Sequence, residues 1–247
     1  MNINSTAFTI FNIEVKWYGI LIALGAFLAI YFAGKLAKRA GLYDDVVIDF
    51  AFLAIPFGIV GARLYYVIFE WDYYSAYPLE IINIRNGGLA IYGGIIAGII
   101  VGYFFSKWKK INFLTLADCA MPGVSLAQGI GRWGNFINGE AHGGPTNLPW
   151  GILVNGQKVH PTFLYESILD IGIFIFLYFY LSKHKKFEGQ LFMYYLIIYG
   201  IGRFLIEGLR TDSLYIGPIR ASQLVSLIMI VVGVSYTIYK YKKADEI

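Results

Sequence analysis

Residues 17–39 read WYGILIALGAFLAIYFAGKLAKR, a long apolar run that ends in a cluster of basic side chains. The apolar part covers residues 17–34, and Lys35, Lys38 and Arg39 follow it. A helix that crosses a bilayer needs about 20 predominantly apolar residues. Basic residues beside such a helix favour the cytoplasmic side. The stretch therefore predicts a membrane-spanning helix whose C-terminal end lies at the cytoplasm.

The composition of the whole chain agrees with a membrane protein. Of the 247 residues, 57% are hydrophobic and 15% are charged, and the mean hydropathy is +0.59. Soluble domains have about 45–50% apolar and about 25% charged residues. These values argue against a water-soluble enzyme, a disordered chain and a nucleic-acid-binding protein. We expect lipid to surround the protein and no nucleic acid to be a partner.

Apolar runs recur along the chain and predict seven transmembrane helices. They cover residues 17–34, 47–69, 88–106, 113–130, 163–181, 190–208 and 221–239. The run at 113–130 contains Asp118, Pro122 and Gln128, so its neighbours should be protein rather than lipid. The expected fold is an all-α polytopic membrane protein with one domain, residues 1–247. An extracytoplasmic loop, residues 131–162, would join the fourth and fifth helices.

Clusters of basic residues follow every odd-numbered predicted helix. The later clusters are Lys107, Lys109 and Lys110, then Lys183, Lys185 and Lys186, then Lys240, Lys242 and Lys243. Seven spans place all the clusters on one side, which the positive-inside rule identifies as the cytoplasm. The N-terminus is then predicted outside and the C-terminus in the cytoplasm.

The other basic residues fall at the outer side of the predicted helices and are mostly arginines. They are Lys16, Arg63, Arg85, Arg132, Lys158, Arg203, Arg210 and Arg220. A guanidinium group binds phosphate or carboxylate through two parallel hydrogen bonds. The set therefore predicts recognition of an anionic group at the outer leaflet. The alternative is that Arg–Glu pairs merely hold helices together.

The most unusual segment, residues 131–146, reads GRWGNFINGEAHGGPT and begins where the fourth predicted helix reaches the outer face. Its polar side chains are those of Arg132, Asn135, Asn138, Glu140 and His142. The glycines between them let backbone N–H groups approach a ligand closely. The segment predicts a binding site, and the alternative is an ordered turn whose polar groups satisfy one another.

Further candidate site residues lie on other predicted helices. Arg203, Glu207 and Arg210 share one face of the sixth helix, although an Arg–Glu pair at this spacing also suits a local salt bridge. Tyr18 and Tyr92 have structural explanations too, as an interfacial anchor and as packing beside glycines. We interpret Glu166 as a charge partner for the N-terminus of the fifth helix.

Other kinds of site find little support in the sequence. The single cysteine, Cys119, excludes an intrachain disulfide, and we interpret it as a small buried side chain. His142, His160 and His184 do not have helical metal-ligand spacing. The N-terminus lacks the pattern of a cleavable signal peptide. We therefore expect no metal and no cofactor, and we expect the first helix to be retained.

The segment GRWGNFINGEAHGG, residues 131–144, resembles the signature of the bacterial prolipoprotein diacylglyceryl transferases. It fits the pattern Gly-Arg-x-Gly-Asn-Phe-x-Asn-x-Glu-x-x-Gly at every specified position. The resemblance covers nearly the whole chain. Similar segments occur in the same order at Trp17–Gly19, Gly61–Leu64, His160–Glu166, Tyr199–Glu207 with Arg210, and Ser222–Gln223.

The resemblance implies a seven-helix bundle with its N-terminus outside, in agreement with the charge pattern. It also implies transfer of a diacylglyceryl group from phosphatidylglycerol to the thiol of the lipobox cysteine in a preprolipoprotein signal peptide, with release of glycerol phosphate. This is the first step of bacterial lipoprotein maturation. The expected location is the bacterial cytoplasmic membrane, with the active site facing the outer leaflet.

By the same resemblance, Arg132, Arg203 and Glu140 are expected to be catalytic. The residues expected to bind phosphatidylglycerol are Arg132, Asn135, Asn138, Tyr18, Tyr92, Glu207 and Arg210. Tyr92 is a departure, because the family usually has histidine there. A tyrosine with a pKa of about 10 is a poor base at neutral pH. The residues leave the proton acceptor open among Glu140, His142 and water.

Three other functions fit a polytopic membrane protein. A transporter or channel would have inverted repeats and polar residues near the midplane, whereas the polar residues here gather near the outer face. A serine-type intramembrane protease would need a nucleophilic serine motif and a histidine on another helix, and neither is found. A different phospholipid transferase or a phospholipase would share the arginine-rich outer site, and only the family motif argues against it.

Overall fold

The computed structural model describes residues 5–11, 13–84, 87–211 and 213–245, without the side chains of Ile13, Ile216 and Asp245. The chain divides into two compact units. One unit comprises residues 37–117, and the other comprises residues 1–36 together with residues 118–247.

Each of the seven predicted apolar runs overlaps a long helix. The long helices are α1 (Trp17–Arg39), α2 (Val46–Phe69), α4 (Ile91–Lys109), α5 (Phe113–Ile137), α6 (Thr162–Ile175), α7 (Gln190–Glu207) and α8 (Ala221–Asp245). A π-helical segment, η2 (Phe176–Tyr180), and a 3₁₀ turn, η3 (Leu181–Lys183), extend α6. The prediction of a loop from residue 131 was wrong at its start, because α5 continues to Ile137.

Six helical segments in the described part of the chain are long and apolar enough to cross a membrane. They are α1, α2, α4, α5, the segment from α6 to η3, and α8. The remaining long helix, α7, contains Arg203 and Glu207 near its C-terminal end. The helical, polytopic architecture thus agrees with the sequence, while the count of seven spans and their orientation stay predictions.

In the unit of residues 37–117, α2 and α4 pack closely at a pair of glycines. A Cβ atom added to Gly61 would lie 2.7 Å from the carbonyl oxygen of Gly93, so only glycine allows this approach. After α2 come two short elements that the sequence analysis did not predict, α3 (Trp71–Ala76) and the 3₁₀ helix η1 (Pro78–Ile82).

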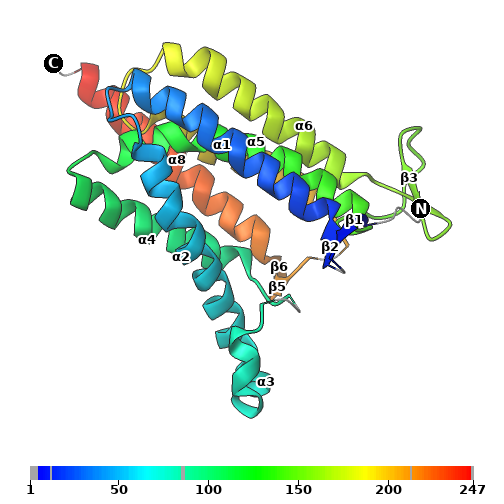
Figure 1. The fold of residues 1–247 in the computed structure, drawn as a ribbon. Coiled ribbons are helices and arrows are strands. Elements are labelled where there is room, and N and C mark those ends of the chain that lie inside the picture. Colours follow the sequence, from blue (N-terminus) through cyan, green and yellow to red (C-terminus); the bar gives the residue numbers. More distant parts are fainter. Residues whose placement is uncertain (1–4, 12, 85–86, 212, 246–247) are drawn as a thin grey trace. The chain divides into compact units, whose positions relative to one another are not determined.

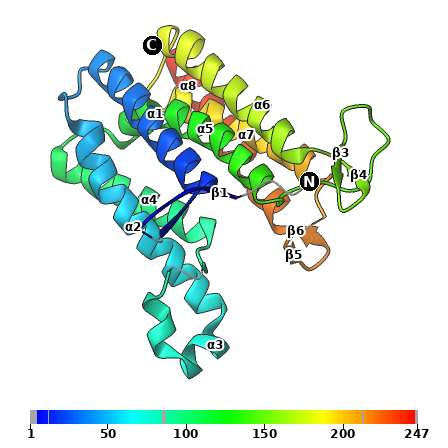
Figure 2. The ribbon, with the colours of Figure 1, turned by 45° about the vertical axis from the view of Figure 1, so that its right-hand side comes forward.

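In the other unit, α1, α5 and α6 run side by side, as both views show (Figures 1 and 2). Protein surrounds the polar groups of α5, as predicted. The buried Asp118 accepts hydrogen bonds from the backbone N–H groups of Gly189 (2.8 Å) and Phe192 (2.9 Å). Gln128 accepts one from the Tyr195 hydroxyl at 2.8 Å. The hydrogen bonds from Phe192 and Tyr195 tie α5 to α7, and the one from Gly189 ties α5 to the residue that precedes α7.

Three small antiparallel hairpins occur among the described residues and were not predicted. They are β1–β2 (Thr6–Ile10 and Ile13–Lys16), β3–β4 (Ile152–Val154 and Gln157–Val159) and β5–β6 (Tyr215–Ile216 and Ile219–Arg220). The β3–β4 hairpin turns at Asn155 and Gly156, which have φ angles of +50° and +80°. Asn-Gly with two positive φ angles is typical of a two-residue type I′ turn.

Candidate active site

A buried cluster of charged side chains forms around Glu166. Its Oε2 atom lies 2.5 Å from a terminal nitrogen of Arg132. Its Oε1 atom accepts a hydrogen bond of 2.6 Å from Arg203 and one of 3.3 Å from Arg210. Glu166 is only 3% exposed. One carboxylate therefore holds three of the arginines that the sequence analysis singled out.

A second carboxylate, Glu207, completes the ion pairs of Arg203. The two side chains are one turn apart on α7 and lie 2.7 Å apart. Glu207 is 1% exposed, so this pair is buried. Arg220 donates a hydrogen bond to the backbone carbonyl of Glu207. The predicted local salt bridge between Arg203 and Glu207 is thus present as part of a larger network.

Close packing of α5 against α6 brings Arg132 to Glu166. A Cβ atom on Gly129 would lie 3.2 Å from the carbonyl oxygen of Ser167, so a larger residue would push the helices apart. The Ser167 hydroxyl donates to the carbonyl of Gly129 at 2.8 Å. Ser167 also accepts a hydrogen bond of 3.1 Å from the Trp133 indole. These contacts fix α5 against α6 where the ion pairs form.

In the segment of residues 131–146, the first half belongs to α5 and lies against Tyr18. A Cβ atom on Gly134 would overlap the Tyr18 ring, which explains a glycine at this position. Asn135 is half-buried on the last turns of α5. Asn138 lies just beyond the helix and is exposed. The structure thus brings Tyr18 to the backbone of the motif.

Glu140 lies apart from the ion-pair cluster. Its side chain is exposed, and none of the arginines in the described residues lies within salt-bridge distance of it. His142 is half-buried, with its Nδ1 atom 3.3 Å from the carbonyl oxygen of Gly143. The catalytic role predicted for Glu140 stays a prediction.

Backbone hydrogen bonds hold the loop after α5 against the end of α7. The N–H of Gly143 donates to the carbonyl of His160, and the N–H of Gly144 donates to that of Leu209, both at 2.9 Å. The Thr162 hydroxyl donates to the carbonyl of Ala141 at 2.6 Å. The two glycines of the motif therefore allow close backbone packing against His160 and Leu209.

Not every arginine that the sequence analysis places at the outer side belongs to the cluster. Arg63 donates to backbone carbonyls of the segment that joins α2 and α4. The acceptors are Glu80, Ile81, Asn83, Gly87 and Gly88. For Arg63, the prediction of an anion-binding role was wrong, because backbone oxygens occupy its donors. Arg85 lies outside the described residues.

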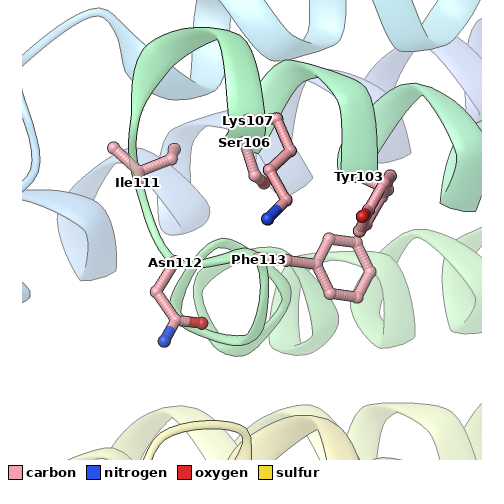
Figure 3. Close-up of a pocket in the computed structure, with 6 residues that line it drawn as sticks. All are labelled: Tyr103, Ser106, Lys107, Ile111, Asn112 and Phe113. Carbon is pink, nitrogen blue, oxygen red and sulfur yellow. The ribbon is translucent and has the colours of Figure 1, made fainter.

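Tyr92 lies in the unit of residues 37–117, in the first turn of α4. Its ring centroid is 6.4 Å from that of Tyr65. The same unit contains a cavity of about 300 Å³ between α4 and the start of α5 (Figure 3). Its lining residues are Tyr103, Ser106, Lys107, Ile111, Asn112 and Phe113. This lining includes none of the predicted site residues.

Sequence reasoning missed the central position of Glu166. It was interpreted as a charge partner for a helix terminus, whereas it pairs with arginines from α5, from α7 and from the residues after α7. One signal was available, since few carboxylates lie on the apolar helices and a buried charged side chain is usually paired. Asp170, one turn further along α6, was also missed and is fully buried.

Comparison with known proteins gives consistent matches over most of the chain. The family model described as prolipoprotein diacylglyceryl transferase matches residues 5–239. A phosphatidylglycerol–prolipoprotein diacylglyceryl transferase of Clostridioides difficile is 57% identical over 237 residues, which are 96% of this chain and 95% of the relative. The protein of the same name from Finegoldia magna is also 57% identical, with the same coverage. One from Staphylococcus aureus is 47% identical over 96% of this chain and 89% of the relative.

Proposed function

The chain belongs to the prolipoprotein diacylglyceryl transferase family, and on this premise we propose that it transfers the diacylglyceryl group of phosphatidylglycerol to a prolipoprotein. The acceptor is the thiol of the lipobox cysteine in the signal peptide, and the released product is glycerol phosphate. The names of the relatives support both substrates. The buried arginine cluster around Glu166 is the observation that carries the proposal.

The cluster is suited to hold a phosphodiester. Arg132, Arg203 and Arg210 point their guanidinium groups at one small region around the Glu166 carboxylate. The Nε–H group of Arg132 is buried and donates to no acceptor among the described residues. Arginine forms strong charge-assisted hydrogen bonds with phosphate oxygens. Arg132 and Arg203 therefore bind the lipid phosphate, with Glu166 orienting both side chains.

The reaction places negative charge on the group that these arginines bind. The cysteine sulfur attacks the glycerol carbon that carries the phosphate ester, and a C–S bond forms as the C–O bond breaks. The bonding electron pair moves to the oxygen of the departing glycerol phosphate. Donors aimed at a developing charge stabilise the transition state, most strongly where water is excluded. Glu140, His142 or water accepts the thiol proton.

The remaining site residues of the sequence analysis keep supporting roles in this proposal. Tyr18 lies against the motif backbone at Gly134, which places it beside the turn that carries Arg132. The residues proposed to contact the lipid are Tyr18, Tyr92, Asn135, Asn138, Glu207 and Arg210. Glu207 acts through Arg203, with which it forms a buried ion pair.

The chain is a multi-pass membrane protein, and we place it in the bacterial plasma membrane. The proposed arrangement has seven spans, including α7, with the N-terminus outside and the C-terminus in the cytoplasm. The lysine clusters after α1, α4, η3 and α8 then lie on the cytoplasmic side. The arginine cluster lies toward the outer leaflet, where the acceptor cysteine of an exported protein arrives.

The test is transfer from phosphatidylglycerol to a synthetic lipobox peptide by purified variants. Arg132→Ala and Arg203→Ala should each lower kcat by at least about 10²–10³-fold, the usual cost of removing one donor to a transition-state anion. Arg39→Ala, at the exposed C-terminal end of α1, is the matched control and should keep wild-type activity. Wild-type-like transfer by both cluster variants would falsify the proposal.

The same assay separates this function from that of a phospholipase. Release of glycerol phosphate should require the peptide and should stop when serine replaces the peptide cysteine. Release without any thiol acceptor would mean that water is the natural acceptor and would overturn the proposed transfer.

A further inference from the structure

The cavity between α4 and the start of α5 plays no part in the proposed transfer. All its lining residues lie in the unit of residues 37–117, whereas Arg132, Glu166 and Arg203 belong to the other unit. Its volume of about 300 Å³ is at the small end of the usual range for ligand sites, about 300–1,000 Å³. The described lining contains no acidic side chain. Such a cavity has room for a small polar headgroup but not for a whole lipid.

Lys107 brings a positive charge to this cavity. Its side chain points into the cavity, and its Nζ atom lies 5.7 Å from the centre of the Tyr103 ring (Figure 3). An ammonium group at this distance is attracted to an aromatic ring. Lys107 has no carboxylate within salt-bridge distance among the described residues, whereas Lys109 pairs with Asp49 at 2.8 Å. The charge of Lys107 is therefore left for a ligand.

Asn112 supplies hydrogen-bond donors to the same lining. Its side-chain oxygen accepts the backbone N–H of Leu114 at 2.8 Å and so caps the start of α5. This contact leaves the NH₂ group, which donates to no acceptor in the described part of the chain. Phosphate oxygens accept hydrogen bonds from both ammonium and amide groups, and those from ammonium groups are the stronger. Lys107 and Asn112 together thus match a phosphate group.

An exposed apolar face of α4 continues from the cavity. Ile96, Ile99 and Ile100 precede Tyr103 by seven, four and three residues, so all four side chains share one face of the helix. The three isoleucines are 50%, 52% and 50% exposed. Because α4 is long and apolar enough to cross a membrane, acyl chains cover such a face. A polar cavity that continues into an apolar face fits a phospholipid better than a free phosphate ion.

We propose that this cavity binds the headgroup phosphate of an anionic phospholipid, with Lys107 and Asn112 on the phosphate and the acyl chains along α4. Basic pockets between membrane helices on the cytoplasmic side are typical sites for anionic headgroups. In the proposed orientation the lipid belongs to the cytoplasmic leaflet and is not the transferred lipid. The inference goes beyond the proposed function, because it requires no reaction of this lipid.

Native mass spectrometry of the full-length protein in neutral detergent counts the bound lipid molecules. With phosphatidylglycerol as the probe, one bound molecule should be held about 10–100-fold more weakly in Lys107→Gln than in wild type, the usual effect of removing a charged hydrogen-bond donor. Lys110→Gln is the matched control, because it removes the same charge from an exposed lysine outside the lining. It should change binding by less than about threefold. Equal losses in the two variants would mean that the lysines attract lipid only through their general charge, and the cavity site would be wrong.

Asn112→Asp tests the site without removing the helix cap. Asparagine and aspartate are equally good N-caps, so the midpoint of thermal unfolding should stay at or above that of wild type. The added negative charge repels a phosphate, so this variant should lose the same lipid molecule as Lys107→Gln. Wild-type lipid binding by a stably folded Asn112→Asp would overturn the proposal.

Two further comparisons identify the ligand. Inorganic phosphate at the same concentration as the lipid should displace no phosphatidylglycerol, because the acyl chains contribute to binding. Displacement would mean that the site takes free phosphate and that the assignment to a lipid is wrong. Phosphatidylcholine carries a phosphate but no net charge, and Lys107→Gln should weaken its binding less than that of phosphatidylglycerol. An equal effect on both lipids would contradict a site for anionic lipid.

Discussion

The carboxylate of Glu166 links α6 to α5, to α7 and to the residues after α7. A change in any of these contacts therefore affects the others. Its partners Arg132, Arg203 and Arg210 have little exposure, with side chains that are 21%, 16% and 11% accessible. Removing one partner of a buried ion pair typically costs about 3–5 kcal/mol, because the other charge stays buried. The same pairs thus hold the helices together and orient the donors proposed to bind phosphate.

Gly134 on α5 gives a sharp test of the packing beside this cluster. In Gly134→Ala the new methyl group meets the Tyr18 ring, and we expect a loss of about 1–3 kcal/mol in unfolding free energy together with reduced transfer. Gly131→Ala, one turn earlier, is the matched control. Its Cβ atom would make only an ordinary contact, 3.5 Å from Ile22, so the better helix propensity of alanine should leave stability equal or raised by about 0.5–1 kcal/mol.

A double-mutant cycle isolates the clash itself. In a Tyr18→Ala background the ring is gone, so Gly134→Ala should cost little when thermal unfolding is measured. An equal cost of Gly134→Ala with and without the Tyr18 ring would show that the close approach is not what selects glycine here.

At the level of single residues, the sequence predicts which arginines are unusual but not what each one binds. Arg63 and Arg132 look alike in sequence, since both lie at the predicted outer side of an apolar helix. Their partners differ because the segment after α2 folds back to offer carbonyl oxygens to Arg63, while α6 offers a carboxylate to Arg132. Such partners come from residues far away in the chain, so local patterns do not identify them.

Among the elements, α7 depends on a carboxylate from a different helix at its N-terminus. Asp118 of α5 accepts N–H groups of Gly189 and Phe192, and Lys185 lies 3.1 Å from the same carboxylate. A negative charge at a helix N-terminus is favourable. This contact sets where α7 begins and so where Arg203 and Glu207 lie.

The pKa of Lys185 connects this contact to pH. Burial alone lowers the pKa of its ammonium group, but the Glu188 hydrogen bond and the Asp118 charge outweigh burial, so the pKa is raised above its usual value. A group with a raised folded-state pKa contributes its full stabilisation below its unfolded pKa, which is about 10.4 for lysine. The contribution is lost as the pH rises through the folded pKa.

Lys185→Met should therefore destabilise the protein at neutral pH, by about 1–2 kcal/mol for a partly exposed pair with a buried carboxylate. The difference from wild type should shrink as the pH rises above about 10.4. Thermal unfolding in detergent measures both effects. Lys183→Met, which alters a nearby exposed lysine, should show no such pH dependence, and a constant difference for Lys185→Met at all pH values would contradict the argument.

Periodicity and hydropathy predict the long helices well but say little about the short elements between them. The run predicted at 47–69 corresponds to α2, Val46–Phe69, because a long apolar stretch has only the helix available to it in lipid. The hairpin β3–β4 was missed although its Asn155-Gly156 turn is a strong local signal. The extension of α5 to Ile137 was missed because the glycines of the motif suggested a loop.

At the scale of the whole molecule, the number of spans decides on which side each functional group acts. The charge pattern requires α7 to cross the membrane, because without it the lysines after η3 and those after α8 would lie on opposite sides. Yet α7 carries Arg203 and Glu207, which pair with each other and with Glu166. Neutralised in this way, the two charges are compatible with a span whose polar face is covered by protein.

Cysteine accessibility tests this topology directly, because the chain has a single, buried cysteine that can be removed by Cys119→Ser. In that background Thr211→Cys and Lys186→Cys place exposed thiols at the two ends of α7. A membrane-impermeant maleimide added to intact cells should label Thr211→Cys, and it should label Lys186→Cys only after permeabilisation. Asn147→Cys, in the predicted outer loop, and Lys110→Cys, in a predicted cytoplasmic cluster, are the controls for the two sides. Labelling of Thr211→Cys and Lys186→Cys from the same side would mean that α7 does not span. The lysine clusters predicted to be cytoplasmic would then fall on both faces, and the charge pattern would no longer explain the orientation.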